Sequence, residues 1–330
     1  MKPYRATRKP AEDSHGLPKA SRLEREFVSQ LLTEIREWKV VARRQAGSSI
    51  LYIKGEDDPL HEGVRDGPSG HLIRALFHHL DFDENRLFRW FLQHKLVQAL
   101  ILSKLIPGSV PPTRGLCAVI SQSHRGALRQ QVETWKERGY LIKKTLITGS
   151  GEHGRVDFPR EAIAALEANH CETQVDQEEY MLQKRIDVAD EFRVHSVERH
   201  VVEDLTIGRY RGGFMRTAAG EANSYVQSLL NKLPDGLTNG TIHNWDVART
   251  TGGNFVVIEI NLTGYHPTYR EGFQCSGFFR GVHGPAMLAR LLRFFKSEYG
   301  LSVKFPIRRV GYSPDCLTLY KEIRAQERTL

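Results

Sequence analysis

The sequence predicts a mixed α/β protein of the α+β type, with helices packed on antiparallel sheets. Apolar residues recur at helical spacing in three long stretches, residues 21–44, 219–233 and 285–300. Two apolar runs, 241–248 and 254–261, flank Thr250-Thr251-Gly252-Gly253, which is typical of a β-hairpin. The regular alternation of strand and helix that marks a doubly wound parallel sheet is missing, so antiparallel pairing is favoured.

The other elements follow from periodicity and from the residues that interrupt it. Helices are predicted at residues 71–80, 85–105, 125–138 and 159–169. Strands are predicted at residues 49–53, 116–121, 140–148, 181–186, 192–202 and 206–210. Pro107-Gly108 and Gly139 end two of the helices, because proline cannot continue a helix and glycine readily adopts the conformation that closes one.

The chain has 330 residues, of which 40% are hydrophobic, and this is enough for two or three lobes. Residues 1–20 are basic and polar and contain several prolines, so we expect a disordered tail there. We expect a helical N-terminal lobe over 21–112, a small lobe over 113–186 and a large C-terminal lobe over 187–330.

The net charge is +8 and the pI is about 9.3. A basic tail can bind nucleic acid or acidic surfaces. However, no zinc finger, RNP-like motif or stripe of alternating basic and aromatic residues accompanies it, so nucleic acid is not an expected partner. A polyphosphate substrate would equally favour a positive pocket.

No apolar run approaches the roughly 18 to 20 residues of a membrane span, and the first residues lack an apolar signal core. We therefore expect a cytoplasmic protein without a membrane partner. The cysteines are widely separated and form no CxxC pair, which favours free thiols over a zinc site or a disulfide framework.

The sharpest chemical pattern is Asp246 followed by Glu259 and Asn261. Glu259 and Asn261 lie two residues apart on one predicted strand, so they share a face, and the hairpin can bring Asp246 to them. Two carboxylates and an amide suit magnesium, a hard cation that prefers oxygen ligands. The alternative is the ordinary polar face of a hairpin. Against it, Glu259 lies in an otherwise apolar strand, where an unpartnered acid would be costly to bury.

These residues resemble the metal-binding signature of the ATP-grasp family, in particular of D-alanine–D-alanine ligases and related amino-acid ligases. The resemblance implies an ATP-grasp fold in which the two α+β lobes grip ATP, preceded here by a shortened helical lobe. It implies that Asp246 and Glu259 bind one Mg²⁺, and that Glu259 and Asn261 bind a second. Such ions clamp the β- and γ-phosphates of ATP.

The resemblance also covers the run Glu179–Ile186, which is similar to the family's adenine-binding hinge. The backbone of this run would hydrogen-bond the adenine edge. Met181, Leu182 and Ile186 would lie around the ring, and Gln183 and Lys184 are the further nucleotide-binding residues of the run. Glu191 would accept hydrogen bonds from the ribose. Plain core packing is the alternative for Met181 and Leu182.

Basic and glycine residues upstream complete the likeness. Lys95 would reach a phosphate of ATP, and Lys143 or Lys144 would do so from a strand, depending on its register. Gly149-Ser150-Gly151 resembles the mobile loop over the phosphates, where small residues let backbone N–H groups approach. A solvated helix lysine and a flexible hairpin tip are the alternatives.

One departure concerns the transferring phosphoryl group. Asn244 stands where many of these ligases carry an arginine, so that role must pass to another arginine. The candidates are Arg193, Arg209, Arg211 and Arg249. The loop 263–277 is expected to shape the acceptor pocket, where Arg270 could pair with a substrate carboxylate.

The resemblance implies an ADP-forming ligase that activates a carboxylate as an acylphosphate and joins it to an amine. Amino acids or small peptides are the expected substrates, ATP and Mg²⁺ are the expected cofactors, and a homodimer is one expected assembly. Two alternatives stay open. One is an ATP-grasp kinase that phosphorylates a hydroxyl, and the other is a non-catalytic protein that binds nucleotide or nucleic acid.

Overall fold

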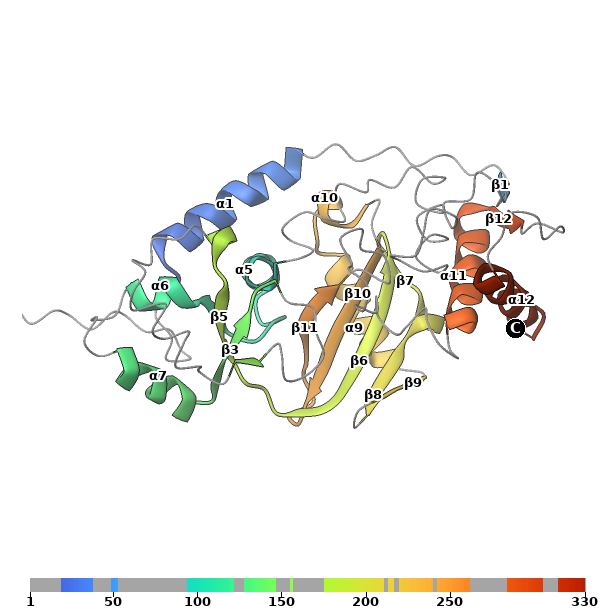
Figure 1. Cartoon of the computed structure of the whole chain (residues 1–330). Helices are drawn as coiled ribbons and strands as arrows, with labels where there is room; N and C mark the ends of the chain where they lie inside the picture. Colours follow the sequence, from blue (N-terminus) through green and yellow to red (C-terminus); the bar gives the residue numbers. More distant parts are fainter. Residues whose placement is uncertain are drawn as a thin grey trace, which may run out of the picture. The chain divides into compact units, whose positions relative to one another are not determined.

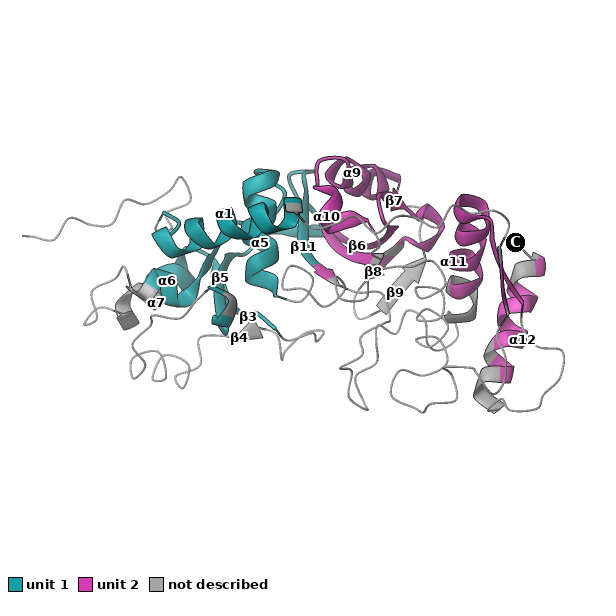
Figure 2. Cartoon of the chain, turned by 90° about the horizontal axis from the view of Figure 1, so that it is seen from above, with its two compact units in different colours: residues 1–37, 90–189, 248–259 teal, residues 38–89, 190–247, 260–330 magenta. Residues whose placement is uncertain are grey.

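We describe a computed structural model of the chain, in which residues 19–37, 49–52, 94–121, 128–146, 155–156, 175–210, 213–216, 220–239, 242–261, 284–304 and 314–329 are described. The chain forms two compact units (Figure 2). Unit 1 comprises residues 1–37, 90–189 and 248–259, and unit 2 comprises residues 38–89, 190–247 and 260–330. Each unit contains both helices and strands, which confirms the α+β expectation.

Unit 1 is built on a four-stranded sheet with the order β2-β5-β3-β4 (Figure 1). Its strands are β2 (Thr113–Gly115), β3 (Tyr140–Lys144), β4 (Arg155–Val156) and β5 (Tyr180–Lys184). All neighbours are antiparallel, with Arg114 opposite Leu182 and Ile142 opposite both Leu182 and Val156. Both faces of the strand β5 are buried in its middle, since Met181, Leu182 and Gln183 are all buried.

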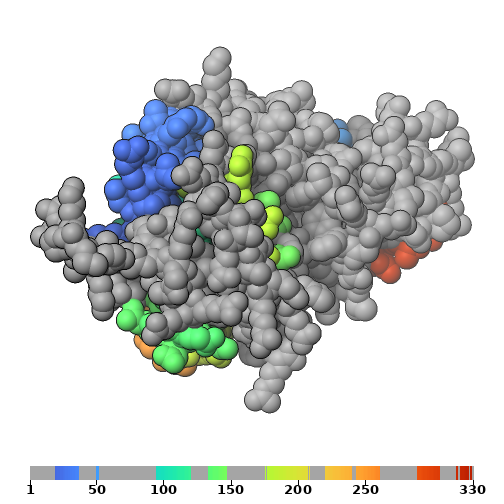
Figure 3. All heavy atoms as spheres, turned by 60° about the vertical axis from the view of Figure 1, so that its left-hand side comes forward, coloured from blue at the N-terminus to red at the C-terminus, as the bar shows by residue number. Residues whose placement is uncertain are grey.

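The helices of unit 1 are α1 (Arg22–Glu37), α5 (Lys95–Leu105), α6 (Leu116–Ser121) and α7 (Leu128–Glu137), with a short 3₁₀ turn, η2 (Val175–Gln177). Helix α1 packs against α5, α5 packs against β2, and α7 packs against β3. Helix α5 buries seven consecutive residues from Leu96 to Leu102, so it forms the centre of this unit's core. The outer side of α1 is exposed, as its blue surface in Figure 3 shows.

The predicted hairpin of residues 241–261 is confirmed as β10 (Ile242–Thr250) and β11 (Phe255–Asn261). Its turn is closed by hydrogen bonds from Gly253 N to Thr250 O and from Thr250 N to Asn254 O, both 2.8 Å long. Gly253 has φ +83°, a value that glycine adopts without the steric penalty of other residues. The tip, residues 248–259, belongs to unit 1, where Val257 N donates to Ser109 O at 2.7 Å.

The second sheet has the order β11-β10-β6-β8-β9, and β7 pairs with the end of β6. The remaining strands are β6 (Val188–Val197), β7 (His200–Val201), β8 (Ile207–Tyr210) and β9 (Gly213–Arg216). Most of this sheet belongs to unit 2. Its core is centred on Trp245, which is fully buried and donates its indole N–H to Ser196 Oγ at 2.9 Å.

Unit 2 also contains α9 (Gly220–Leu230), α10 (Asp235–Thr238), α11 (Gly284–Tyr299), α12 (Pro314–Thr329) and the 3₁₀ turn η3 (Glu203–Leu205). Strand β1 (Ser49–Tyr52) pairs in parallel with β12 (Leu301–Lys304), and α11 packs on β12 and on α12. The strand at 49–53 was predicted, but its parallel partner near the other end of the sequence was not.

Two element predictions are wrong. Residues 116–121 form the helix α6 instead of a strand, because Leu116 and Val119 point to one buried side at a helical spacing and the N–H of Cys117 is bonded by the Glu178 carboxylate. The helix predicted over 85–105 has a boundary at His94, which is extended (φ −94°, ψ 104°) and caps α5 by accepting from Val97 N.

A third prediction, one strand over 192–202, is also wrong. The chain turns back after Val197, and β7 pairs with β6 through Ser196 opposite Val201 and Val197 opposite His200. The turn residue Glu198 has φ +51°, which is uncommon for a residue other than glycine. No glycine or asparagine marks this turn in the sequence, and its stabilising contacts come from elsewhere in unit 2, as described in the Discussion.

Several predicted features lie outside the described residues. They are the tail before residue 19, the helices at 71–80 and 159–169, the run Gly149-Ser150-Gly151, Arg211, the loop 263–277 and Arg270. The predicted lobe borders at 112 and 186 remain predictions.

Candidate functional site

Lys95 and Glu259, predicted respectively to bind phosphate and metal, form an ion pair within unit 1. Lys95 Nζ lies 2.7 Å from Glu259 Oε2, and the two side chains are 10% and 18% exposed. At this separation and burial, water screens the attraction only weakly. The pair therefore keeps a charged carboxylate in the otherwise apolar strand β11.

Lys95 is the first residue of α5, the end at which backbone N–H groups point outward and the helix dipole is positive. Three of these N–H groups already have partners, since Lys95 N donates to Thr145 O at 2.9 Å, Val97 N to His94 Nδ1 at 3.4 Å and Gln98 N to His94 O at 3.0 Å. Burial lowers the pKa of the adjacent His94 to about 4, so its imidazole is neutral near pH 7 and adds no charge. Lys95 is thus the side chain that brings positive charge to this helix end.

Arg193 and Asp246 form a second ion pair, within unit 2. Arg193 Nε donates to Asp246 Oδ1 at 2.7 Å and Arg193 Nη2 donates to Oδ2 at 2.8 Å. This is a bidentate arrangement, and the side chains are 14% and 8% exposed. The strand neighbours β6 and β10 supply the two partners, so the pair is fixed by the sheet itself.

Two buried polar residues, His195 and Asn244, lie on the same strands as this pair, each two residues away from one of its members. His195 follows Arg193 by two residues on β6. Burial lowers its pKa well below 6.5, and the charge of Arg193 acts in the same direction, so the ring is neutral. Asn244 precedes Asp246 by two residues on β10 and is 1% exposed, and its side-chain oxygen accepts no hydrogen bond from any of the described residues. An arginine at this position would have to be equally buried.

Lys143 and Lys144 are adjacent on β3 and both are half-buried. They point to opposite faces, because side chains alternate along a strand. Lys144 Nζ lies 6.0 Å from the centre of the Tyr180 ring on β5, at the outer limit of a cation–π contact. The choice between the two lysines as a phosphate ligand stays open.

The structure places the middle of the run 179–186 inside the sheet of unit 1. Met181 and Leu182 are at most 1% exposed, and Gln183 is 3% exposed and donates to Thr113 Oγ1 at 2.9 Å. These residues lie opposite partners in both β2 and β3, so their backbone hydrogen bonds belong to the sheet. Met181 and Leu182 therefore pack in the core, and their contact with adenine stays a prediction.

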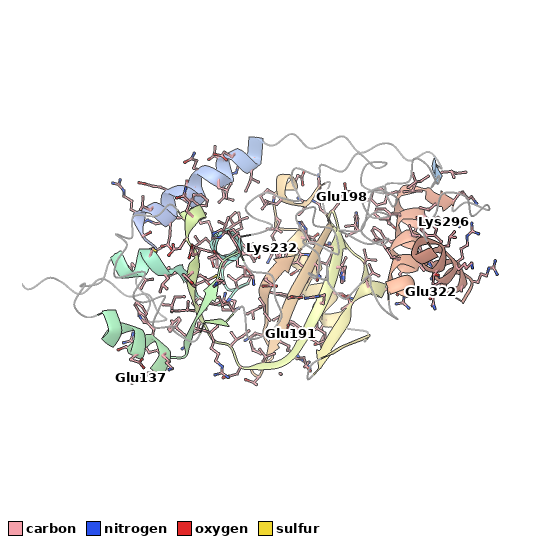
Figure 4. The ribbon with its side chains drawn as sticks, viewed as in Figure 1. Glu137, Glu191, Glu198, Lys232, Lys296 and Glu322 are labelled. Carbon is pink, nitrogen blue, oxygen red and sulfur yellow. The ribbon has the colours of Figure 1, made fainter. Side chains whose placement is uncertain are left out.

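The remaining hinge residues differ from one another. Lys184 bonds the carbonyl of Arg138, and its Nζ lies 4.9 Å from the centre of the Tyr140 ring, so it is engaged within the sheet. Ile186 is half-buried after the end of β5. Glu191 is half-buried on β6 opposite Arg209 of β8, and Figure 4 shows it toward the end of β6 that lies away from Glu198.

Two further predicted residues lie on the hairpin. Arg249 is half-buried near the end of β10, in the part that belongs to unit 1. Asn261 is the last residue of β11, and its side chain lies outside the description. The described residues contain no group of three or more His, Cys, Asp or Glu side chains that could hold a metal ion. The assignment of Asp246, Glu259 and Asn261 to magnesium stays a prediction.

The donor set nevertheless fits magnesium. Asp246 and Glu259 are hard oxygen donors, and each lies 2.7 Å from a basic side chain.

The sequence analysis missed a pair of buried carboxylates in unit 1, Glu24 and Glu178, which are 1% and 3% exposed. Glu24 Oε1 accepts from Gly115 N at 3.0 Å, and Glu178 Oε1 accepts from Cys117 N. Burial raises the pKa of Glu178 to about 8, and the nearby Glu24 adds to the rise. The capping pattern Ser21-x-x-Glu24 could have revealed Glu24, whereas no local signal marks Glu178.

No protein-family model and no curated protein matches this sequence. Among the helices in the described ranges, none combines the length and apolarity needed to cross a membrane.

The chain is similar to several solved structures over part of its length. One is the N5-carboxyaminoimidazole ribonucleotide synthetase of Thermotoga maritima, with 16% identity, a TM-score of 0.34, and coverage of 52% of this chain and 41% of that one. A second is the macrocyclase MdnC of Microcystis aeruginosa, solved with its precursor peptide, with 17% identity, a TM-score of 0.36 and coverage of 58% of each chain.

A third is the ATP-grasp ligase PsnB, solved with a minimal precursor, Mg and ADP, with 15% identity, a TM-score of 0.36, and coverage of 67% of this chain and 65% of that one. This chain spans less than half the length of the Thermotoga synthetase. The likeness covers part of each chain and leaves the substrates undetermined.

Proposed function

We propose that this chain is an ATP-dependent ligase of the ATP-grasp type, which activates a carboxylate as an acylphosphate and joins it to an amine. The observation that carries the proposal is the pair of carboxylates, Asp246 and Glu259, each held 2.7 Å from a basic side chain and mostly shielded from water. These are the two acids that the sequence pattern assigned to metal. Of their basic partners, Lys95 is predicted by the family resemblance to reach a phosphate of ATP, and Arg193 is one of four arginines considered for the transferring phosphoryl group.

In the proposed reaction, a carboxylate oxygen of the substrate attacks the γ-phosphorus of ATP, and the bond to the leaving ADP oxygen breaks. The amine nitrogen then attacks the acyl carbon, inorganic phosphate leaves, and the nitrogen loses a proton to solvent. Lys95 and Arg193 would position the phosphates and stabilise their charge. Asp246, Glu259 and Asn261 would hold Mg²⁺, which when bound neutralises phosphate oxygens.

The role of this chain is therefore positioning and charge stabilisation. His94 and His195 are poor candidates for acid–base work at neutral pH, because burial lowers the pKa of His94 to about 4 and lowers the pKa of His195 well below 6.5. Transfer to an amine through an acylphosphate does not require a side-chain nucleophile.

An ADP-release screen over pairs of amino acids and short peptides tests the proposal. We expect ADP release to require both a carboxylate and an amine, and Glu259→Gln to lower it at least about 100-fold, because a charged ligand of the metal is lost. Glu137→Gln is the matched control, since Glu137 is an exposed glutamate of the same unit.

Two other outcomes of the ADP-release screen would indicate a different function. Release of ADP with a hydroxyl compound and no amine would identify a kinase. Binding of ATP without turnover of any pair would contradict the ligase proposal and favour a non-catalytic protein.

A further inference from the structure

A buried threonine, Thr145, joins the start of helix α5 to the sheet of unit 1. It directly follows β3, the strand that carries Lys143 and Lys144, and its carbonyl faces Lys95, the first residue of α5. Building on the proposed function, we infer that Thr145 is a positioning residue, which holds Lys95 beside the end of β3 so that the lysines of these two elements can contact one polyphosphate. Thr145 itself need not touch the nucleotide.

Three hydrogen bonds of Thr145 connect segments of unit 1 that are far apart in the chain. Its backbone N–H donates to Glu179 O at 3.0 Å, and its hydroxyl donates to Glu178 O at 2.5 Å. Its carbonyl accepts from the backbone N–H of Lys95 at 2.9 Å. Two consecutive carbonyls before β5 therefore hold Thr145, and Thr145 in turn holds the first residue of α5.

The backbone N–H of Lys95 depends on a partner outside its helix, because the first N–H groups of a helix have no acceptor within it. At α5, His94 supplies the acceptors for Val97 and Gln98. The acceptor for Lys95 comes instead from Thr145, at the end of a strand. Thr145 therefore fixes the backbone of Lys95 relative to the sheet.

Burial makes the hydroxyl of Thr145 hard to replace. Thr145 is 0% exposed, whereas the next residue, Leu146, is 61% exposed. Bulk water therefore does not reach the hydroxyl position, and a valine there would leave Glu178 O without this donor. His94, which precedes Lys95, bonds the backbone of Glu178 as well, so the start of α5 is attached to the same segment on both sides.

The side chain of Lys95 is also held at its far end. Its Nζ lies 2.7 Å from Glu259 Oε2. An ammonium group has three N–H donors, so a bond to one carboxylate leaves capacity for phosphate oxygens. The direction of these donors depends on where the backbone of Lys95 lies, and Thr145 determines that position.

Paired substitutions of Thr145 separate positioning from stability. Thr145→Val keeps the shape of the side chain and removes the hydroxyl, whereas Thr145→Ser keeps the hydroxyl and removes a methyl group. Calorimetry with the non-hydrolysable analogue AMPPNP and Mg²⁺ measures nucleotide affinity, and thermal melting measures stability. We expect both variants to melt at a lower temperature. Thr145→Val should bind AMPPNP about tenfold more weakly, and Thr145→Ser should stay within about twofold of the unmodified protein.

Thr206→Val is the matched control. Thr206 is a buried threonine of unit 2 whose hydroxyl donates to Asn223 Oδ1, also at 2.5 Å. This variant should melt at a lower temperature and bind AMPPNP with unchanged affinity. If Thr145→Val does not fold, Thr145→Ala compared with Thr145→Ser gives the same contrast in the hydroxyl.

A double-mutant cycle tests whether Thr145 acts through Lys95. Lys95→Met removes the ammonium group and is expected to weaken AMPPNP binding. Adding Thr145→Val to Lys95→Met should then change the affinity by less than about twofold, because the positioned charge is already gone. A merely structural role of Thr145 would give the same tenfold loss in both backgrounds.

The outcomes separate the positioning role from the proposed function. If the unmodified protein binds AMPPNP but Thr145→Val binds it equally well, or if the loss persists in full in Lys95→Met, the positioning role is wrong and the proposed function stands. If the unmodified protein does not bind AMPPNP in the presence of Mg²⁺, the proposed function itself is wrong.

Discussion

At the scale of single residues, the buried carboxyl group of Glu178 has surroundings that change its protonation. Its carboxyl group is packed against Gly115, where any side chain would collide with it, and it accepts from the backbone N–H of Cys117. Glu24 and the thiol of Cys117 also face it, and His94 bonds the backbone of Glu178. Burial raises the pKa of the carboxyl group to about 8, so near neutral pH it is largely protonated in the folded state.

This shift predicts a pH-dependent stability. The Glu178 carboxyl has an ordinary pKa of 4.5 and a folded pKa of about 8. Between these values the unfolded chain has released a proton that the folded chain retains, so the free energy of unfolding falls as pH rises, by at most about 1.4 kcal/mol per pH unit. Glu178→Gln removes this titration. Its melting temperature, measured against that of the unmodified protein, should improve steadily from pH 5 to pH 8.5.

Glu179→Gln is the control for this experiment, because Glu179 is the exposed neighbour. A difference in melting temperature between Glu178→Gln and the unmodified protein that stays constant with pH would contradict the raised pKa.

At the scale of elements, the β6–β7 turn depends on distant parts of unit 2. Tyr299 of α11 donates its hydroxyl to Glu198 Oε2 at 2.8 Å. The neighbouring Arg199 donates to the carbonyls of Leu230 and Leu233 at 3.1 and 2.7 Å and pairs with Asp235. These contacts offset the cost of the positive φ at Glu198, about 1 kcal/mol for a residue other than glycine.

We therefore predict that Tyr299→Phe destabilises the protein by about 1–2 kcal/mol, because a hydrogen bond to a charged and partly buried carboxylate is lost while the ring remains. Urea denaturation measures the change. Ser297→Ala on the exposed side of the same helix should have almost no effect. Equal stability of Tyr299→Phe and the unmodified protein would mean that the turn is stable without this contact.

At the scale of the whole molecule, the net charge of +8 comes partly from residues 1–18, the predicted basic tail, and partly from the rest of the chain. Residues 1–18 contain four basic and two acidic side chains, so the tail contributes only part of the excess. The proposed ligase activity depends on the ion pairs inside the units. Binding of polyanions, by contrast, would depend on the tail and weaken with salt.

Deleting residues 1–18 should consequently leave ADP release within about twofold of the full chain, because the proposed site lies elsewhere, while weakening any salt-sensitive binding of a labelled RNA. ADP-release assays and fluorescence anisotropy at low and high salt measure the two effects. If the deletion abolished function while Glu259→Gln left it intact, the chain would be a nucleic-acid-binding protein instead of a ligase.

The sequence by itself determined the α+β class, the hairpin of residues 241–261 and most helices, because amphipathic periodicity and glycine turns are local signals. It also singled out Asp246 and Glu259 by residue type and spacing, and Lys95 and Arg193 through the resemblance to the ATP-grasp family.

Only the tertiary structure decided which of these residues pair with one another, since Lys95 and Glu259 are far apart in the chain. It also decided that Met181 and Leu182 are core, that residues 116–121 are helical, and that Glu178 holds its proton. In each case the deciding factor is burial by neighbours that are distant in sequence, and local patterns contain no information about those neighbours.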